Sequence, residues 1–134
     1  MTVIRIAAVV LRNSDGEVLS VRKRGTDAFM MPGGKLEPGE TGRGAAVREI
    51  SEELGLDLEP GALTFLGRFS ARAANEAGCS VDCDVFIHHD PLHRVPAVRA
   101  EIAEARFFPV GSTAPSLAPL SREVVFPVLA DISR

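Results

Sequence analysis

The 23-residue stretch GKLEPGETGRGAAVREISEELGL constrains the fold more than any other part of the chain. It begins with a glycine-bearing loop and continues into a segment where Ala46, Ile50 and Leu54 follow one another at four-residue steps. Residues at this spacing share one face of a helix, so the pattern predicts a helix that buries this face against a neighbouring layer. We expect the helix to begin near Thr41 or Gly42 and to end at Leu54, because a glycine follows in the usual capping position.

Another side of the same helix is acidic. Glu49, Glu52 and Glu53 stand at spacings that bring their side chains together, with Arg48 beside them. Like charges packed in this way destabilise a helix unless a cation lies among them. Hard divalent cations prefer carboxylate oxygens, so we expect the three glutamates to bind Mg²⁺, with Mn²⁺ as a substitute. A single glutamate would be explained more simply as part of a solvated helix face.

The composition is that of a globular domain, which we expect to span residues 1–134 as one unit. Hydrophobic residues make up 46% and charged residues 25%, with a formal net charge of −3. A nucleic-acid-binding surface is normally basic, so this balance argues against nucleic acid as a partner. No apolar run approaches the roughly 20 residues of a membrane span, so no membrane partner is expected. Two cysteines are too few for a disulfide framework, which favours a reducing cytoplasm.

Several segments carry the patterns of strands. Residues 3–11 are rich in Val, Ile and Ala, and they are predicted to form a buried central strand. An Asn-Ser-Asp-Gly turn signal precedes residues 18–23, so these first two strands are expected to pair as a hairpin. Residues 63–71 and 80–89 are expected to form a second hairpin, and residues 106–110 a further short strand.

The chain ends in a segment with helical periodicity. Residues 121–132 carry apolar side chains at helical spacing, and Pro127 within this pattern predicts a kink or a break. Strands on both sides of one central helix, followed by a terminal helix, predict an α/β layered domain with a mixed sheet.

Other residues are candidates for binding a ligand. Arg22, Lys23 and Arg24 end a predicted strand with three positive charges, and we assign Arg22 and Arg24 as candidate phosphate contacts; a solvated strand end is the equal alternative. The chain has no Trp or Tyr, so the stacking of a nucleobase would fall to phenylalanine, with Phe29, Phe69 or Phe86 as the candidates. A core position is the more common fate of phenylalanine. Asn75 is a candidate base contact or a turn residue.

One known signature runs through the acidic helix. The pattern G-x5-E-x7-R-E-U-x-E-E-x-G-U, where U is aliphatic, is met at every defined position from Gly34 to Leu56. The chain therefore resembles the Nudix hydrolases, which also commonly have Met-Pro-Gly just before this box. The resemblance implies an α/β/α sandwich around a central mixed β-sheet. It also implies Mg²⁺-dependent hydrolysis of a nucleoside diphosphate linked to another group.

The resemblance implies roles for the acidic residues. Glu52 and Glu53 would be the chief metal ligands, and Glu49 would be a third ligand or the base that activates water. Family members differ in which carboxylate is the base, and several use an acid from a later loop. Glu101 is the candidate for that role here, with Glu104 second.

The remaining residues of the box would support the glutamates or bind the substrate. Arg48 belongs to the catalytic set by holding a glutamate of the cluster in place, and Glu40 is expected to support the same arrangement. Gly34 and Lys35 are assigned to substrate binding, Gly34 through backbone geometry and Lys35 through phosphate. For Lys35 a role as an ordinary surface lysine is equally compatible with the sequence.

The substrate is much less constrained than the chemistry. The chain resembles the mutator-type enzymes that clear oxidised nucleoside triphosphates, so a small-molecule nucleotide of this kind is expected. ADP-ribose or a nucleotide sugar is the alternative substrate, and a non-catalytic nucleotide-binding module is the alternative role. A metal or redox site built from Cys79, Cys83 and nearby histidines fits no common zinc spacing. Many family members are dimers, so a homodimer is an open expectation.

Overall fold

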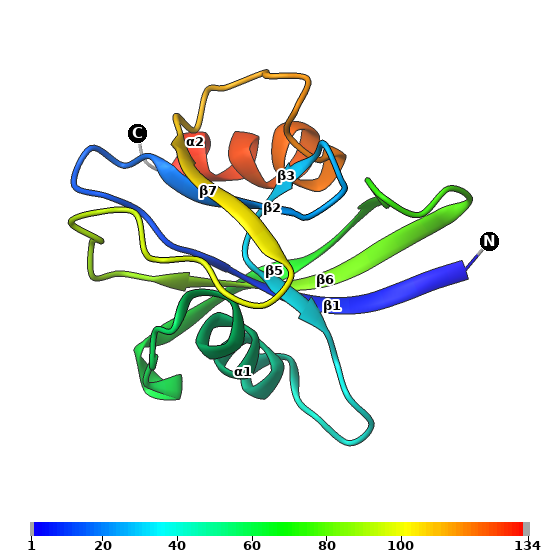
Figure 1. The fold of residues 1–134 in the computed structure, drawn as a ribbon, viewed down its shortest axis with the longest axis horizontal. Helices are drawn as coiled ribbons and strands as arrows, with labels where there is room; N and C mark the ends of the chain where they lie inside the picture. Colours follow the sequence, from blue (N-terminus) through cyan, green and yellow to red (C-terminus); the bar gives the residue numbers. More distant parts are fainter. Residues whose placement is uncertain (1, 133–134) are drawn as a thin grey trace.

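Two helical layers enclose the strands of this protein, as a computed structural model describing residues 2–132 shows (Figure 1). The helix α1 (Gly42–Leu54) covers one side, and the terminal helix α2 (Phe126–Ile132) covers the other (Figure 1). A four-stranded mixed sheet has the order β4 (Gly33–Lys35), β1 (Thr2–Val10), β6 (Cys79–His88) and β5 (Leu63–Arg72). A three-stranded sheet has the order β3 (Phe29–Met30), β2 (Val18–Lys23) and β7 (Ile102–Phe108). The α/β/α arrangement with a mixed central sheet is therefore confirmed.

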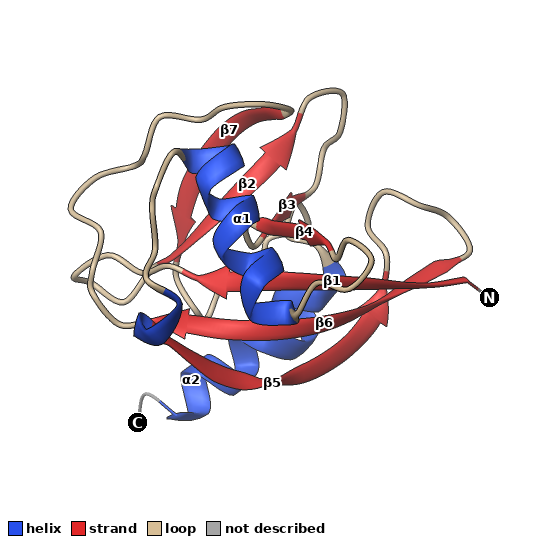
Figure 2. Ribbon diagram, turned by 90° about the horizontal axis from the view of Figure 1, so that it is seen from below, coloured by secondary structure: helices blue, strands red, loops and turns tan. Residues whose placement is uncertain are grey.

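The strand β1 lies inside the mixed sheet and separates two cores. Ala7 and Val9 point toward α1, whereas Ala8 and Val10 point toward α2, as the alternation of a strand requires. The apolar face of α1 predicted from the sequence is buried in the core on the α1 side of β1, together with Ala45. Figure 2 shows α1 lying across this sheet. The helix is therefore held by its apolar face, and its acidic residues are left near β4.

The predicted second hairpin is confirmed, because β5 and β6 pair antiparallel along their whole length. The predicted first hairpin is wrong. The turn forms at Asn13, and the two arms meet at one isolated antiparallel bridge between Arg12 and Val18. Its two backbone hydrogen bonds run from the Leu19 amide to the Leu11 carbonyl oxygen and from the Asn13 amide to the Glu17 carbonyl oxygen. Both edges of β1 are already taken, by β4 on one side and by β6 in parallel on the other. The strand β2 consequently leaves β1 and pairs with β3 and β7.

The last two elements differ slightly from their predicted bounds. The strand β7 begins at Ile102, four residues before the predicted start, because its pairing with β2 continues to Lys23 across a register shift. The predicted break in the terminal helix is confirmed: a π-helical segment, η2 (Leu120–Val125), precedes α2. Pro127 has no amide hydrogen, and its ring would meet the carbonyl group of Glu123 in a continuous α-helix.

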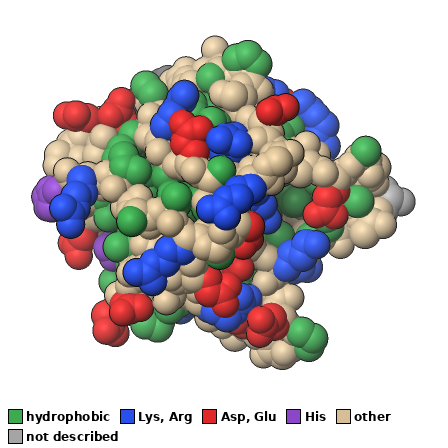
Figure 3. All heavy atoms as spheres, in the orientation of Figure 1, with side chains coloured by type: hydrophobic (Ala, Val, Ile, Leu, Met, Phe, Trp, Pro, Cys, Tyr) green, Lys and Arg blue, Asp and Glu red, His purple; other side chains and the backbone are tan. Residues whose placement is uncertain are grey.

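The surface carries charges of both signs. On the face seen in Figure 3, acidic and basic side chains lie interspersed, without a broad basic area. No helix in the described part of the chain is both long and apolar enough to cross a membrane. A short 3-10 turn, η1 (Pro60–Ala62), connects the region after α1 to β5.

Gly33 allows β4 to lie directly against β1. A Cβ atom at this position would overlap with the carbonyl oxygen of Ala7, so any side chain would force the two strands apart. We expect Gly33→Ala to lower the free energy of unfolding by about 1–3 kcal/mol, the usual cost of overpacking. Urea denaturation measures the change. Gly61→Ala is the matched control, because a Cβ there has no neighbour within 4 Å; equal unfolding midpoints for the two variants would contradict the close contact.

Candidate active site

The ends of α1 are held by local hydrogen bonds. The Thr41 hydroxyl accepts a bond from the Gly44 amide at 3.0 Å, which satisfies one of the free donors at the helix start. At the other end Gly55 adopts φ 65°, and its amide donates to the Ser51 carbonyl oxygen at 3.0 Å. Both ends match the sequence prediction. With the helix held in this register, Glu53 lies under the loop that carries the glycines.

Glu53 is the most deeply placed acid of the site. Glu53 is only 2% exposed, and one of its carboxylate oxygens accepts a hydrogen bond from the Gly33 amide at 3.2 Å. Burial, with the charge of Glu49 as the second cause, raises the pKa of Glu53 to about 8. Two carboxylates therefore share a site that has little water to stabilise them.

Glu49 occupies the space next to the glycine loop. Its Oε2 atom is buried and has no hydrogen-bond partner among residues 2–132. Burial raises the pKa of this carboxyl, although the guanidinium of Arg48 opposes the shift. A Cβ atom at Gly34 would lie 2.5 Å from the Glu49 carboxylate, so the glycine leaves room for that group. A buried carboxylate oxygen without a donor is an anionic position that a cation would satisfy.

Arg48 ties the loop to the helix. Its Nε and Nη2 atoms donate to the two oxygens of Glu40, each at 2.8 Å, and Nη2 also donates to the Lys35 carbonyl oxygen. The paired hydrogen bonds from Arg48 lower the pKa of Glu40 to about 2. Arg48 and Glu40 thus hold the loop in its position above Glu49. The geometry agrees with a supporting role for both residues.

Glu52 differs from its two neighbours. Its side chain is 55% exposed, and its Oε2 atom lies 3.4 Å from Nη1 of Arg48. Within the described range 2–132, no three acidic, histidine or cysteine side chains converge as a ready metal site. The structure therefore brings Glu49 and Glu53 together and leaves Glu52 at the rim. Among the same described residues the two cysteines take part in no such cluster, and both are free thiols.

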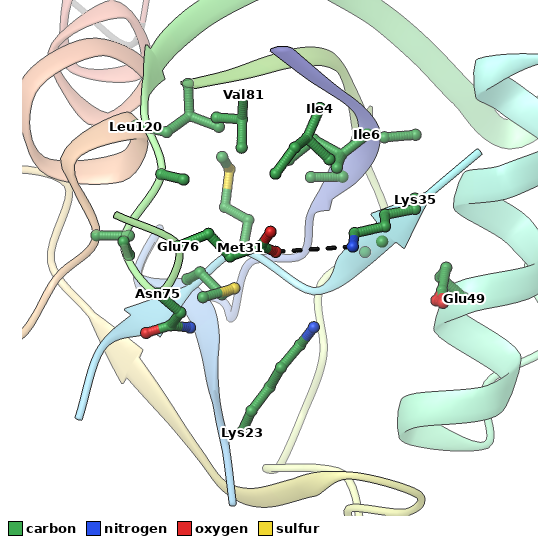
Figure 4. A pocket seen from close by; sticks show the side chains of 18 of the residues that line it. Ile4, Ile6, Lys23, Met31, Lys35, Glu49, Asn75, Glu76, Val81 and Leu120 are labelled. Atoms are coloured by element: carbon green, nitrogen blue, oxygen red, sulfur yellow. Dashed lines mark ion pairs between the residues drawn. The ribbon is translucent and has the colours of Figure 1, made fainter. Parts of the chain in front are cut away.

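A cavity of about 740 Å³ opens beside these acids. One part of it is polar and is lined by Glu49, Glu101 and two lysines, Lys23 and Lys35. The other part is apolar, with aliphatic side chains from β1, β6 and η2 gathered around it (Figure 4). The Nζ atom of Lys35 lies 3.7 Å from a carboxylate oxygen of Glu76, which reaches across from the turn between β5 and β6 (Figure 4).

Lys23, and not its arginine neighbours, lines the cavity. The prediction that Arg22 and Arg24 contact phosphate is thus not supported by their positions. Arg22 is paired with Glu104 at 3.3 Å and donates to the Thr26 carbonyl oxygen. Successive side chains of a strand point to opposite faces, so residue 23 shares the α1 side with Leu19 and Val21. The alternation could have identified Lys23 from the sequence, because the apolar residues of the strand define its inward face.

The candidate base contacts Phe29 and Asn75 lie in different places in the structure. Phe29 is 5% exposed and packs edge-on against Phe108, with ring centroids 5.2 Å apart. It lies in the α2-side core and does not line the cavity, so the structure favours the core interpretation over stacking on a base. Asn75 does line the cavity, from the same turn as Glu76.

The two candidates for the general base, Glu101 and Glu104, also differ in position. Glu101 lines the cavity, and its Oε1 atom lies 3.9 Å from the Nζ atom of Lys23. Its carbonyl oxygen accepts a bond from the Arg24 amide at 2.8 Å, which fixes the loop to the end of β2. The Arg99 amide donates to the Glu53 carbonyl oxygen, so the same loop is also bound to α1. Glu104 instead faces Arg22, outside the cavity.

Known proteins with similar sequences support the interpretation of this region as an active site. A 61-residue segment is 41% identical to the 8-oxo-dGTP diphosphatase of Escherichia coli, covering 42% of this chain and 46% of that protein. A 51-residue segment is 41% identical to the RNA pyrophosphohydrolase of Pseudomonas fluorescens, covering 38% of this chain and 32% of that protein. The matches thus span less than half the length of these curated relatives.

The fold is shared over a greater length. The crystal structure of the MutT protein from Methanosarcina mazei superposes with a TM-score of 0.80 at 19% identity, covering 99% of this chain and 96% of that one. The sequence model of the NUDIX domain matches residues 2–128. With its box folded into α1 and the preceding loop as described, this chain belongs to the Nudix family.

Proposed function

We propose that this protein hydrolyses the pyrophosphate linkage of a nucleoside triphosphate, including oxidised forms. The observation that carries the proposal is the buried pair Glu49 and Glu53 at the polar end of a cavity that also holds two lysines. The names of the relatives, an 8-oxo-dGTP diphosphatase and an RNA pyrophosphohydrolase, support a phosphate chain attached to a nucleoside. ADP-ribose and nucleotide sugars are the second choice.

A divalent cation, Mg²⁺ or Mn²⁺, fits the acidic residues of this site. Glu49 and Glu53 would hold it, because one has a buried oxygen without a donor and the other is buried beside it. Glu52 could join them by turning its exposed side chain away from Arg48. When bound, the ion neutralises phosphate charge and lowers the pKa of water.

The other side chains of the polar end have separate tasks. Lys23 and Lys35 face the same cavity and would neutralise the phosphates that extend past the glutamates. Water attacks one phosphorus atom of the anhydride, and the bond to the leaving phosphate group breaks. Glu101 would accept the proton of that water, and its position in the cavity wall, on a loop bound to both α1 and β2, supports this role. Glu49 is the alternative base.

A substrate panel with Mg²⁺ tests the proposal. We expect nucleoside triphosphates, ordinary or 8-oxo, to be cleaved faster than ADP-ribose, a nucleotide sugar or a dinucleoside polyphosphate. Product identification shows whether pyrophosphate or phosphate is released. Glu53→Gln should lower turnover of the best substrate by at least about a hundredfold, because a buried ligand and its charge are lost. Turnover near the wild-type rate in this variant would overturn the assignment of the acidic pair.

The stability of the metal-free protein should depend on pH through Glu53. Its pKa is about 8 in the folded protein and 4.5 ordinarily, so between these values the folded state binds more protons than the unfolded state. The free energy of unfolding is therefore expected to fall as pH rises from 4.5 to about 8. Urea titrations across this window measure the slope.

Glu53→Gln is the control for this pH dependence, because an amide in place of the carboxyl cannot lose a proton. The variant should show a flatter slope, and added Mg²⁺ should raise stability at the alkaline end of the window in the wild type alone. Glu40 has a lowered pKa of about 2, so its contribution changes only at more acidic pH. Parallel slopes in the two proteins would show that Glu53 is not the titrating group.

The assignment of Glu101 has its own matched pair of variants. Glu101→Gln should lower kcat by about 10²- to 10⁴-fold, as expected for loss of a general base. Glu104→Gln should leave kcat nearly unchanged, because Glu104 pairs with Arg22 outside the cavity. If Glu101→Gln keeps kcat, the base is another residue and Glu49 becomes the first candidate.

A further inference from the structure

Ala100, the residue before Glu101, has an unusual backbone conformation with φ 55°. Among residues 2–132 it is the one residue other than glycine with a positive φ. A side chain in this left-handed region crowds the backbone, so the conformation is unfavourable for alanine. Ala100 is also exposed, so packing of its side chain does not offset this cost. Contacts of the neighbouring residues must therefore hold the backbone in this conformation.

The residues on both sides of Ala100 and Glu101 are fixed to other elements. The Arg99 amide donates to the Glu53 carbonyl oxygen at 2.8 Å, near the end of α1. Ile102 is fully buried on the α1 side, and its amide donates to the Arg99 carbonyl oxygen at 3.1 Å. Residues 99–102 thus form a four-residue turn with Ala100 and Glu101 at its centre. A positive φ at the first central residue is usually met by glycine, asparagine or aspartate.

The side chain of Arg99 also binds the turn to α1. A Cβ atom at Gly55 would lie 2.5 Å from Cζ of Arg99, so the guanidinium lies directly against the glycine that ends the helix. A positive charge at the C-terminal end of a helix is stabilised by the helix dipole. The turn is therefore joined, through backbone and side chain, to the helix that carries the acidic pair.

The backbone of Glu101 is fixed more firmly than its side chain. Its carbonyl oxygen accepts a hydrogen bond from the Arg24 amide at 2.8 Å. The side chain is 53% exposed, and its ion-pair partner, Nζ of Lys23, lies 3.9 Å away, which is longer than a hydrogen bond. An exposed ion pair of this kind contributes little to holding a side chain in one place. The conformation of the turn therefore sets the direction in which the Glu101 carboxylate points.

We propose that Ala100 is a positioning residue for the hydrolysis, and that its positive φ directs the Glu101 carboxylate into the polar end of the cavity. This inference rests on the proposed function, because it takes Glu101 to be the group that accepts a proton from the attacking water. A negative φ at residue 100 would rotate the following peptide and move the Glu101 side chain, while α1 and β7 keep Arg99 and Ile102 in place. A displacement of a catalytic group by about 1 Å can lower a rate about a hundredfold.

Substitutions at residue 100 test the proposal, because the position is exposed and they differ chiefly in their tolerance of a positive φ. Ala100→Gly and Ala100→Asn accept this conformation and should keep kcat within about threefold of the wild type. Ala100→Val disfavours it and should lower kcat at least about tenfold, with KM changed less than about threefold. Initial rates with Mg²⁺ and the best nucleoside triphosphate measure both constants.

Ala97→Val is the matched control, since Ala97 is an exposed alanine of the same loop without a positive φ. It should keep both kcat and KM. If Ala100→Val does not fold, Ala100→Leu replaces it in every comparison, because leucine is bulky but not branched at Cβ. Full kcat in the valine or leucine variant would overturn the proposal.

The same substitution made in Glu101→Gln shows whether residue 100 acts through Glu101. Ala100→Val should lower kcat no further in this background, because the group that it displaces is already lost. An equal loss in both backgrounds would overturn the proposal. Amide hydrogen exchange reports on the turn itself, and the Ile102 amide should exchange faster in Ala100→Val than in Ala100→Gly or the wild type. A lowered kcat with unchanged exchange would also overturn the proposal.

The wild type and Glu101→Gln separate this inference from the function on which it rests. If the wild type cleaves nucleoside triphosphates and Glu101→Gln keeps kcat, the role of Ala100 fails while the proposed function stands with another base. If the wild type cleaves no nucleoside triphosphate, the proposed function fails, and the inference fails with it.

Discussion

The burial of two carboxylates beneath a glycine loop is the constraint on which the rest of the site depends. A carboxylate oxygen of Glu53 accepts a hydrogen bond from the Gly33 amide, and Glu49 fills the space that a side chain at Gly34 would occupy. Loss of hydration raises the pKa of both groups, and the charge of Glu49 adds to the shift of Glu53. Such a pair persists in a fold only when packing elsewhere holds it, and here the apolar face of α1 supplies that packing.

Hydrogen bonds and close packing join the helix and the loop at several points. Arg48 links the helix to Glu40 with two short hydrogen bonds, and β4 is pressed against β1 at Gly33. The later loop adds a third attachment, because the Arg99 amide donates to the Glu53 carbonyl oxygen. The glycine loop, the helix that follows it and the distant loop at residues 99–101 therefore meet at the polar end of one cavity. The apolar end is formed by other elements, so the walls that meet the rest of a ligand can differ without disturbing the acids.

Much of this could be predicted from local patterns. The bounds of α1 followed from Ala46, Ile50 and Leu54 and from the glycine after them, because helix periodicity and capping are local properties. The pairing of β2 could not be predicted, since it depends on which edges of β1 other strands already occupy. The choice among Arg22, Lys23 and Arg24 was within reach, because strand alternation distinguishes them once the inward face is known.

The sequence by itself determined the family, the layered fold and the helix that carries Glu49, Glu52 and Glu53. Each of these follows from patterns between residues that are close together along the chain. Only the tertiary structure decided that Glu52 lies at the rim, that Glu101 and not Glu104 lines the cavity, and that Ala100 adopts a positive φ. Those distinctions depend on burial and on contacts between segments far apart along the chain. Residue spacing within one helix or loop does not give these contacts, because they form only when the sheets and helices pack together.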